Sequence, residues 1–361
     1  MDKEKKPSRT KAINKLNNNL YMTLKEIIRE HALRYLPAKS LCRFKAVCKD
    51  WKLLISNPFF EHSQANFSRS LSGLFGQTPE GPISFISLDP MAYGVPDPEM
   101  KFLPEPVDLV ASSNGLLCLR GRTEDKAYYI CNPVNQQWKK LPKPEADHGS
   151  IPAVVLVFEP SLLKFETDYQ LICAFPSPDF HDAYEFEMYS STDNSWKVSP
   201  EMLFGERPRV LERNGVHLNG VVYWLSADFS LVGFDLKINR AKCIPCFDMA
   251  ESVGVIDGKI STSRKQGHDL IMCVLSNVSG KATWERRCFF VNQSNMCPDL
   301  SHERHVLTTG SDLAVFHDGK TIFCYNLKTK ETKSIGTESD CNQYNCNGFY
   351  VPCVNSLVSL H

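Results

Sequence analysis

Copies of one strand–turn–strand pattern, spread between residues 129 and 335, constrain the fold of this chain more than any other feature. Each copy has an apolar run, a polar turn and a second run that ends on an apolar residue. The turns begin at Asn132, Ser190, Asp235, Asn277 and Asn326. Their spacing of about 40 to 60 residues is that of a four-stranded propeller blade, so the roughly 290 residues of this region predict about six or seven blades. A lone blade cannot bury its faces, and ring closure supplies the core.

The chain before this region carries a helical pattern. Apolar residues recur at helical spacing in short stretches between Leu24 and Ile55, and Asn57-Pro58 ends the last stretch. Roughly three short helices in about 40 residues make a core too small to be stable alone, so a partner helix is expected to cover it.

These two patterns predict an α+β multidomain chain, in which a small three-helix unit precedes an all-β propeller-like domain. We place a basic tail at 1–20, the helical unit at 21–64, a linker at 65–75 and the β domain at 76–361. The tail is interpreted as disordered, with a nuclear-import patch as the alternative.

The helical unit resembles the F-box of plant F-box proteins. Residues 36–51 read Leu-Pro-x-Lys-Ser-Leu-x-Arg-Phe-Lys-x-Val-Cys-Lys-x-Trp, and Leu54, Ile55, Pro58 and Phe60 continue the match. The resemblance implies docking onto a Skp-type adaptor of a cullin–RING ubiquitin ligase, with some matched residues holding the helices together instead. The adaptor contacts that it implies are Leu33, Leu36, Pro37, Leu41, Val47, Cys48, Trp51 and Leu54.

The β region resembles plant F-box-associated domains, which are kelch-like in size. The resemblance rests on Ser-Ser-Asn-Gly-Leu-Leu-Cys at 112–118, Asn-Pro-Val-Asn at 132–135 and His-Leu-Asn-Gly-Val-Val-Tyr-Trp at 217–224. Val-Gly-Phe-Asp-Leu at 232–236 and the closing segment at 350–360 extend it. It implies that the propeller binds a target protein.

Composition argues against several classes of protein. Lys plus Arg and Asp plus Glu each number 41, so no global field favours nucleic acid or an anionic membrane. No apolar run is long enough to span a bilayer, and the N-terminus lacks the apolar core of a signal peptide. The 14 cysteines are scattered and often lie in apolar runs, which indicates buried reduced thiols. We expect a cytoplasmic or nuclear protein.

No motif predicts catalysis, a metal or a cofactor. The chain has no Gly-x-Ser-x-Gly elbow, phosphate-binding loop or dinucleotide fingerprint after a strand. Cys243 and Cys246 have zinc-ligand spacing, but neighbouring residues of a strand point to opposite faces. The tryptophans at repeat-related positions favour blade packing over a stacking surface. They are Trp138, Trp196, Trp224 and Trp284.

The leading hypothesis is therefore a non-catalytic substrate-recognition subunit of a Skp–cullin–F-box ubiquitin ligase. One alternative is an adaptor-binding interaction protein without productive ligase activity. The other is a propeller hydrolase, which predicts a cluster of titratable residues in the central channel. The identity of the target does not follow from the sequence.

Overall fold

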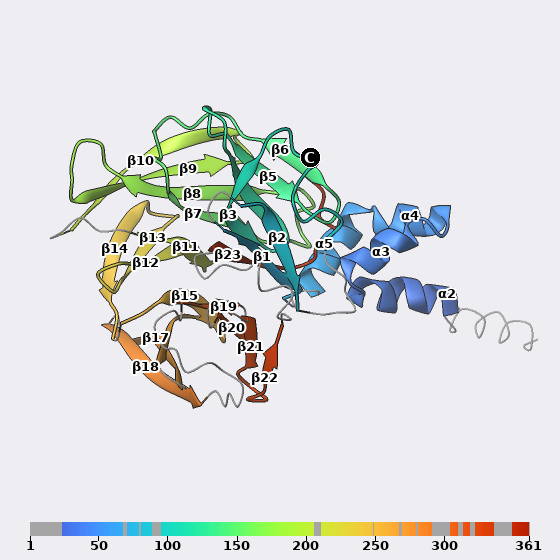
Figure 1. Cartoon of the computed structure of the whole chain (residues 1–361). Coiled ribbons are helices and arrows are strands. Elements are labelled where there is room, and N and C mark those ends of the chain that lie inside the picture. Colours follow the sequence, from blue (N-terminus) through green and yellow to red (C-terminus); the bar gives the residue numbers. More distant parts are fainter. Residues whose placement is uncertain are drawn as a thin grey trace, which may run out of the picture.

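A computed structural model describes twelve segments of the chain, in which strands form a ring and helices lie to one side of it (Figure 1). The predicted basic tail at 1–20 lies outside these segments. The described residues are 24–67, 71–78, 81–88, 95–205, 211–247, 249–266, 269–278, 281–290, 304–309, 313–317, 322–335 and 349–360.

The helical unit is made of short helices separated by breaks. The first is α2 (Leu24–Ile27), which continues through a π-helical segment (Ile28–Ala32) and a 3-10 turn (Leu33–Tyr35). Pro37 and Cys48 have extended backbone angles, and each stands immediately before one of the next two helices. These are α3 (Ala38–Phe44) and α4 (Lys49–Ile55), followed by α5 (Pro58–Phe67).

Helix α5 was not predicted as a separate helix. Asn57-Pro58 does end α4, but Pro58 is also the first residue of α5, a position where its missing N–H costs nothing. The Asn57 side-chain Oδ1 accepts a hydrogen bond from Phe59 N at 2.9 Å, as an N-cap does. The segment expected as a linker at 65–75 contains the end of α5 and the beginning of the first strand.

The described strands form six antiparallel blades, which lies within the predicted range. Blade 1 consists of β1 (Gly73–Gln77), β2 (Ile83–Ser87) and β23 (Phe349–Cys353). Blade 2 consists of β3 (Val107–Ser113), β4 (Leu116–Gly121), β5 (Tyr128–Asn132) and β6 (Gln137–Lys140). Blade 3 consists of β7 (Ala153–Phe158), β8 (Tyr169–Pro176), β9 (Ala183–Ser190) and β10 (Ser195–Phe204).

Blades 4 to 6 each have four strands that are neighbours in chain order, as blades 2 and 3 do. Blade 4 consists of β11 (Leu211–Leu218), β12 (Val221–Ser226), β13 (Ser230–Asp235) and β14 (Arg240–Pro245). Blade 5 consists of β15 (Ser252–Ile256), β16 (Lys259–Gln266), β17 (Asp269–Val278) and β18 (Lys281–Phe290). Blade 6 consists of β19 (Arg304–Thr309), β20 (Leu313–His317), β21 (Ile322–Asn326) and β22 (Thr332–Ser334).

The innermost strands of blades 3 and 4 run parallel and join at Val154 and Asn214, which merges the two blades into one eight-stranded sheet. Blade 1 closes the ring from both ends of the propeller. In it β1 pairs with β2 on one side and with β23 on the other, so Phe75 lies opposite both Phe85 and Val351. The core of the propeller therefore depends on contacts between distant parts of the sequence.

The predicted turns all lie between the two outer strands of a blade. In blade 2 the Asn132 side chain accepts a hydrogen bond from Val134 N at 2.9 Å, and in blade 6 Asn326 accepts one from Lys328 N at 2.9 Å. This local bond explains why the repeat opens with short polar residues.

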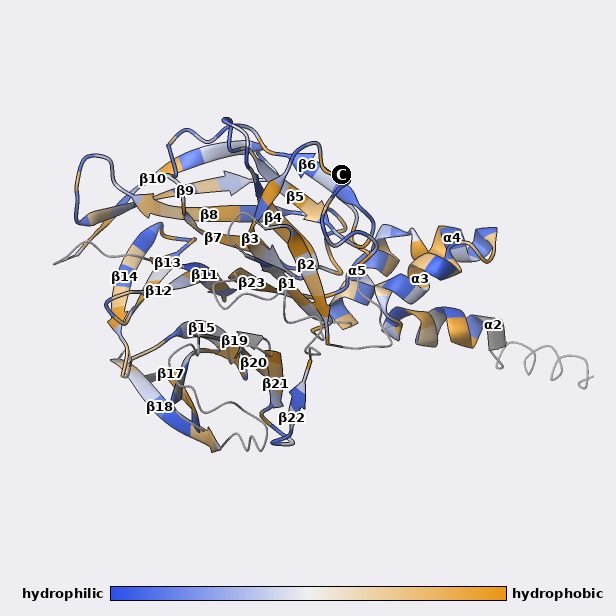
Figure 2. Cartoon of the chain, viewed as in Figure 1, coloured by the Kyte–Doolittle hydropathy of each residue, from blue (hydrophilic) through white to orange (hydrophobic). Residues whose placement is uncertain are grey.

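The tryptophans serve mainly in packing, as expected. Trp224 and Trp196 are buried, and Trp284 donates to the Pro245 carbonyl at 2.9 Å. Trp138 is 41% exposed and meets the Tyr129 ring edge-on. Hydrophobic residues follow the strands, while many connecting loops are hydrophilic (Figure 2).

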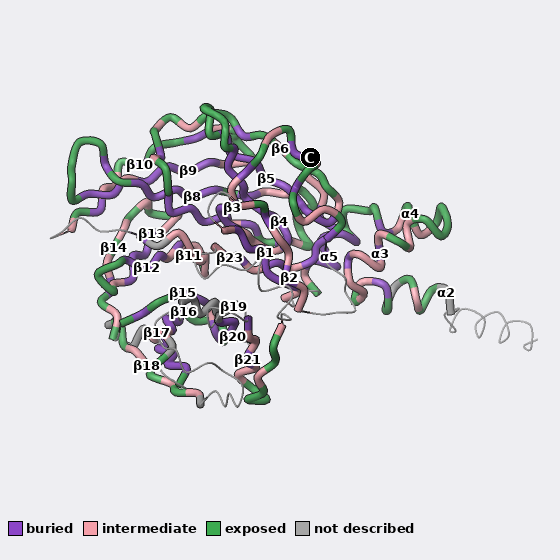
Figure 3. Tube along the Cα trace, viewed as in Figure 1, coloured by how far each residue is buried: buried purple, intermediate pink, exposed green. Residues whose placement is uncertain are grey.

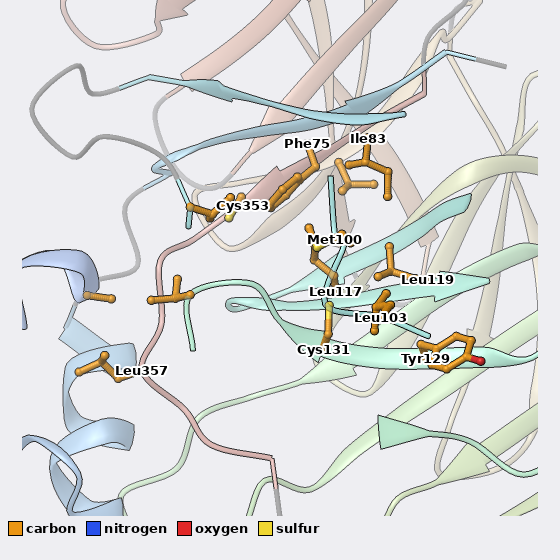
Figure 4. Close-up of a cluster of buried hydrophobic side chains, with 14 of the residues drawn as sticks. Phe75, Ile83, Met100, Leu103, Leu117, Leu119, Tyr129, Cys131, Cys353 and Leu357 are labelled. Carbon is orange, nitrogen blue, oxygen red and sulfur yellow. The ribbon is translucent and has the colours of Figure 1, made fainter. Parts of the chain in front are cut away.

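One hydrophobic cluster runs from the helical unit into blades 1 and 2. It contains Leu41 and Phe60 from the helices, Phe75 and Leu119 from the strands, and Leu357 from the segment after β23. Figure 4 shows this cluster, with Leu357 beside the helices and Cys353 and Phe75 near each other across blade 1. The helical unit thus shares a core with the propeller.

Candidate functional site

The residues expected to contact a partner lie in the 3-10 turn, in α3 and α4, and in the short segments before each of these two helices, and the structure divides them by burial. Leu33 and Leu41 are buried within the chain, where they support the helical unit. Leu36, Pro37, Trp51 and Leu54 are half-buried, while Val47 and Cys48 are exposed. Leu53, which the sequence analysis did not name, is 74% exposed on α4.

Half-buried Leu36, Trp51 and Leu54 pack against the buried cluster of the chain, and one edge of the helical unit stays open. The Phe44 ring lies edge-on to Trp51 at 5.0 Å, which fixes α3 against α4. Val47, in the turn between these helices, is 63% exposed. An apolar edge of this kind is suited to a hydrophobic partner surface.

The opposite side of the helical unit is covered by the propeller. Residues 60–65 of α5 are buried, although four of the six are polar or charged. Figure 3 shows α5 mostly buried and α4 mostly exposed. The unit therefore presents α3 and α4 outward and uses α5 as its attachment.

The attachment is built from side chains of α5 that reach the propeller. His62 Nδ1 accepts a hydrogen bond from Ser161 N at 3.3 Å, and Phe59 meets Phe165 edge-on at 5.7 Å. Gln64, which is fully buried, donates to the Asn355 carbonyl and accepts from Leu357 N. Gln64 lies one helical turn after Phe60, so its place on the buried face could have been found from the spacing.

The segment after β23 lies between α5 and the propeller. Asn132 Nδ2 donates to the carbonyls of Ser356 and Val358, at 3.0 and 2.7 Å. Gly115, at φ +95°, lies against this segment, and a Cβ there would meet Ser356 Cβ at 2.2 Å. The motifs at 112–118 and 132–135 and the closing segment thus form one junction.

A second buried polar group fixes the connection between blades 2 and 3. Glu187, fully buried, accepts hydrogen bonds from the backbone N–H groups of Glu145 and Ala146. Its Oε2 also lies 2.7 Å from His148 Nε2, and His148 Nδ1 lies 2.9 Å from the Tyr128 hydroxyl. These contacts use both carboxylate oxygens, which fits a structural role.

Comparison with known proteins identifies both parts of the chain. A family model described as F-box associated beta propeller domain matches residues 83–355, and the F-box domain model matches residues 26–63. The chain belongs to the F-box-associated β-propeller family. The F-box precedes the propeller, as the sequence motifs predicted.

Curated relatives agree with this family. F-box protein At5g07610 of Arabidopsis thaliana is 29% identical over 60% of this chain and 55% of its own length. F-box protein At3g08750 of the same plant is 26% identical over 66% of this chain and 65% of its own length. F-box/kelch-repeat protein At3g23880, also from Arabidopsis thaliana, is 24% identical over 65% of this chain and 70% of its own length. The chain thus matches about two thirds or less of the first two relatives.

The hydrolase alternative predicted a titratable cluster in the channel of the propeller. At one end of the channel His217 Nδ1 lies 3.5 Å from Glu159 Oε1, and His217 Nε2 accepts a hydrogen bond from Gly220 N at 3.1 Å. Burial lowers the pKa of His217. Both ring nitrogens are occupied by the turn and by Glu159, and this pair therefore gives no support to a nucleophilic site.

Within the described residues, no three His, Cys, Asp or Glu side chains are grouped as metal ligands. Cys243 lies in β14 and Cys246 just after it, and both are half-buried thiols that form no disulfide. Burial raises the pKa of Cys246 to about 12, so its thiol stays protonated near neutral pH. None of the helices in the described part of the chain is long and apolar enough to span a bilayer.

Proposed function

We propose that this chain is the substrate-recognition subunit of a Skp–cullin–F-box ubiquitin ligase. In this proposal the F-box binds a Skp-type adaptor and the propeller binds the protein to be ubiquitinated. The chain catalyses no step itself. Two binding sites on one rigid body raise the effective concentration of the target near the ubiquitin-loaded enzyme.

The observation that carries the proposal is the outward apolar edge of α3 and α4. Val47 and Leu53 are 63% and 74% exposed, on a unit whose other side is already packed against the propeller. Covering a side chain of this size stabilises a complex by about 1.5–3 kcal/mol before the costs of association. A partner that lays helices along this edge would bury it.

The charge on the same helices supports an acidic partner. Helices α3 and α4 carry Lys39, Arg43, Lys49 and Lys52 against one carboxylate, Asp50. Basic residues at the rim of an interface raise the association rate with an acidic partner more than the affinity. They also predict that the association rate falls as salt is added.

Co-purification of the full chain with a Skp-type adaptor tests the proposal. Replacing Leu36 and Pro37 together by Asp is expected to abolish the complex while the propeller stays folded. Because Leu36 also packs inside the F-box, Leu53→Asp provides a second test at a side chain that faces solvent. Ile238→Asp, at a 63% exposed side chain on the propeller, is the matched control and is expected to bind normally.

Retention of the adaptor by both F-box variants would contradict the proposed interface. Recovery of the adaptor without a cullin would instead favour an interaction protein that lacks ligase activity. We further propose that the protein acts in the cytoplasm, the nucleus or both, where such a ligase would meet its targets.

A further inference from the structure

The innermost strands of the propeller enclose a cavity of about 410 Å³ along its axis. Strands β3, β7, β11, β15 and β23 contribute to its walls. Valine is the commonest residue in the walls, which also carry polar side chains such as Ser112, Ser113 and Asn214. The valines are Val110, Val154, Val155, Val216, Val253, Val255, Val351 and Val354.

Arg213 is the one Lys or Arg side chain among the described residues that line this cavity. It lies near the end where the inner strands begin. Its Nη2 donates to the Leu109 carbonyl at 3.0 Å, and its guanidinium lies over the Phe349 ring at 4.1 Å. These contacts orient the guanidinium and leave most of its five N–H donors without a protein acceptor among the described residues.

The charge of Arg213 is not neutralised by a carboxylate in contact with it. Within the described residues no Asp or Glu oxygen lies within 4 Å of its guanidinium. Asp108 is the acidic group whose charge acts on Arg213, but its carboxylate is already bonded to Arg122 at 2.8 Å. Burial lowers the pKa of Arg213, and the side chain still remains charged near neutral pH.

The other titratable groups of the cavity lie at its opposite end. They are His217 and Glu159, whose contacts are described above. Because burial lowers the pKa of His217, its imidazole is neutral near pH 7. The cavity therefore holds the positive charge of Arg213 at one end and the mostly exposed Glu159 carboxylate at the other, with the valines between them.

We propose that this cavity binds a monocarboxylate with an apolar body, whose carboxylate pairs with Arg213 while the body lies against the valines. A guanidinium with open donors accepts a carboxylate through two parallel hydrogen bonds. A phosphate dianion needs more compensating charge than one arginine supplies. The carboxylate can belong to a free small acid or to the C-terminal residue of a protein chain.

Isothermal titration calorimetry of the full chain at pH 7.4 tests this inference and separates a free small acid from a protein C-terminus as the source of the carboxylate. The small-acid arm compares 4-phenylbutyrate with its neutral amide. The peptide arm compares acetyl-Ala-Val-Phe carrying a free carboxylate with the same peptide amidated. In at least one arm the acid is expected to bind saturably and at least about tenfold more tightly than its amide.

Variants locate the site. Arg213→Gln is expected to remove the preference for the acid, and Val216→Phe, which fills the cavity, to weaken acid and amide together. Arg240→Gln, at an exposed arginine outside the cavity, is the control and is expected to bind like the unmodified chain. The inference is overturned if no probe binds saturably, if acid and amide bind equally, or if Arg213→Gln keeps the preference. Adaptor binding plays no part in this assay, so its failure leaves the proposed function unaffected.

Discussion

The Oε1 atom of Gln64 accepts a hydrogen bond at 3.3 Å from the backbone N–H of Leu357, 293 positions further along the chain. Gln64 Nε2 donates to the Asn355 carbonyl at 3.5 Å. Gln64 and Leu357 are both buried. One amide side chain thus joins the last helix of the F-box to the end of the propeller, which fixes the direction in which α3 and α4 face.

Replacing Gln64 by Leu is expected to destabilise the chain by about 1–3 kcal/mol, because the Leu357 N–H would remain buried without an acceptor. Urea unfolding, followed by tryptophan fluorescence, measures the effect. Gln170→Leu, at an exposed position of β8, is the control and is expected to change stability by less than about 0.5 kcal/mol. Equal effects of the two substitutions would show that the junction contributes little.

Asn132→Asp tests the hold of blade 2 on the closing segment. Aspartate keeps the acceptor for Val134 N but loses the donor that binds Ser356 and Val358. We expect a loss of about 1–3 kcal/mol and faster hydrogen exchange at residues 356–360. Asn326→Asp is the matched control, because Asn326 uses its side-chain oxygen for the same turn in blade 6. Equal rates of hydrogen exchange at residues 356–360 in the two variants would contradict a role of Asn132 in holding the closing segment.

Glu187→Ala is expected to cost about 3–5 kcal/mol, since it leaves the buried His148 ring and two backbone N–H groups without their acceptor. The amides of Glu145 and Ala146 should then exchange faster with solvent. Glu285→Ala removes a carboxylate that pairs with Arg287 at the surface, and its effect on stability should be much smaller. Thermal unfolding and hydrogen exchange of the two variants give the comparison.

Cysteine alkylation reports which surfaces a partner covers. Cys48 in the F-box and Cys288 in the propeller are both exposed and should react with iodoacetamide in the isolated chain. Buried Cys353, whose pKa is raised to about 12 by burial, should stay unmodified. Added adaptor is expected to protect Cys48 and to leave Cys288 reactive, as read by mass spectrometry. Unchanged labelling of Cys48 in a formed complex would place the adaptor elsewhere.

The sequence predicted those parts of the fold that depend on local interactions. A turn that opens with Asn or Asp forms its hydrogen bond within three residues, so Asn132, Asp235 and Asn326 marked the outer hairpins of their blades. Local sequence patterns could not predict blade 1. It combines residues 73–87 with residues 349–353, and no periodicity connects them.

The F-box shows a different limit. Helical spacing placed α3 and α4, but interface residues and internal residues share that spacing. Leu41 is therefore buried and Val47 exposed, although the F-box resemblance implied an adaptor contact for both. The sequence analysis used Pro58 only as the end of a helix, but Pro58 also begins α5. A proline disrupts the interior of a helix and is well tolerated at its first position.

Closure of blade 1 by β23 has a consequence for synthesis of the protein on the ribosome. The F-box is synthesised before the strand that pairs with β1 and before the residues that hold α5. A polypeptide that ends before Phe349 would lack the residues that hold α5 against the propeller, and the edge of β1 that pairs with β23 would be left unpaired. Premature termination anywhere upstream should therefore yield an aggregation-prone product that cellular quality control removes, rather than a shortened recognition subunit.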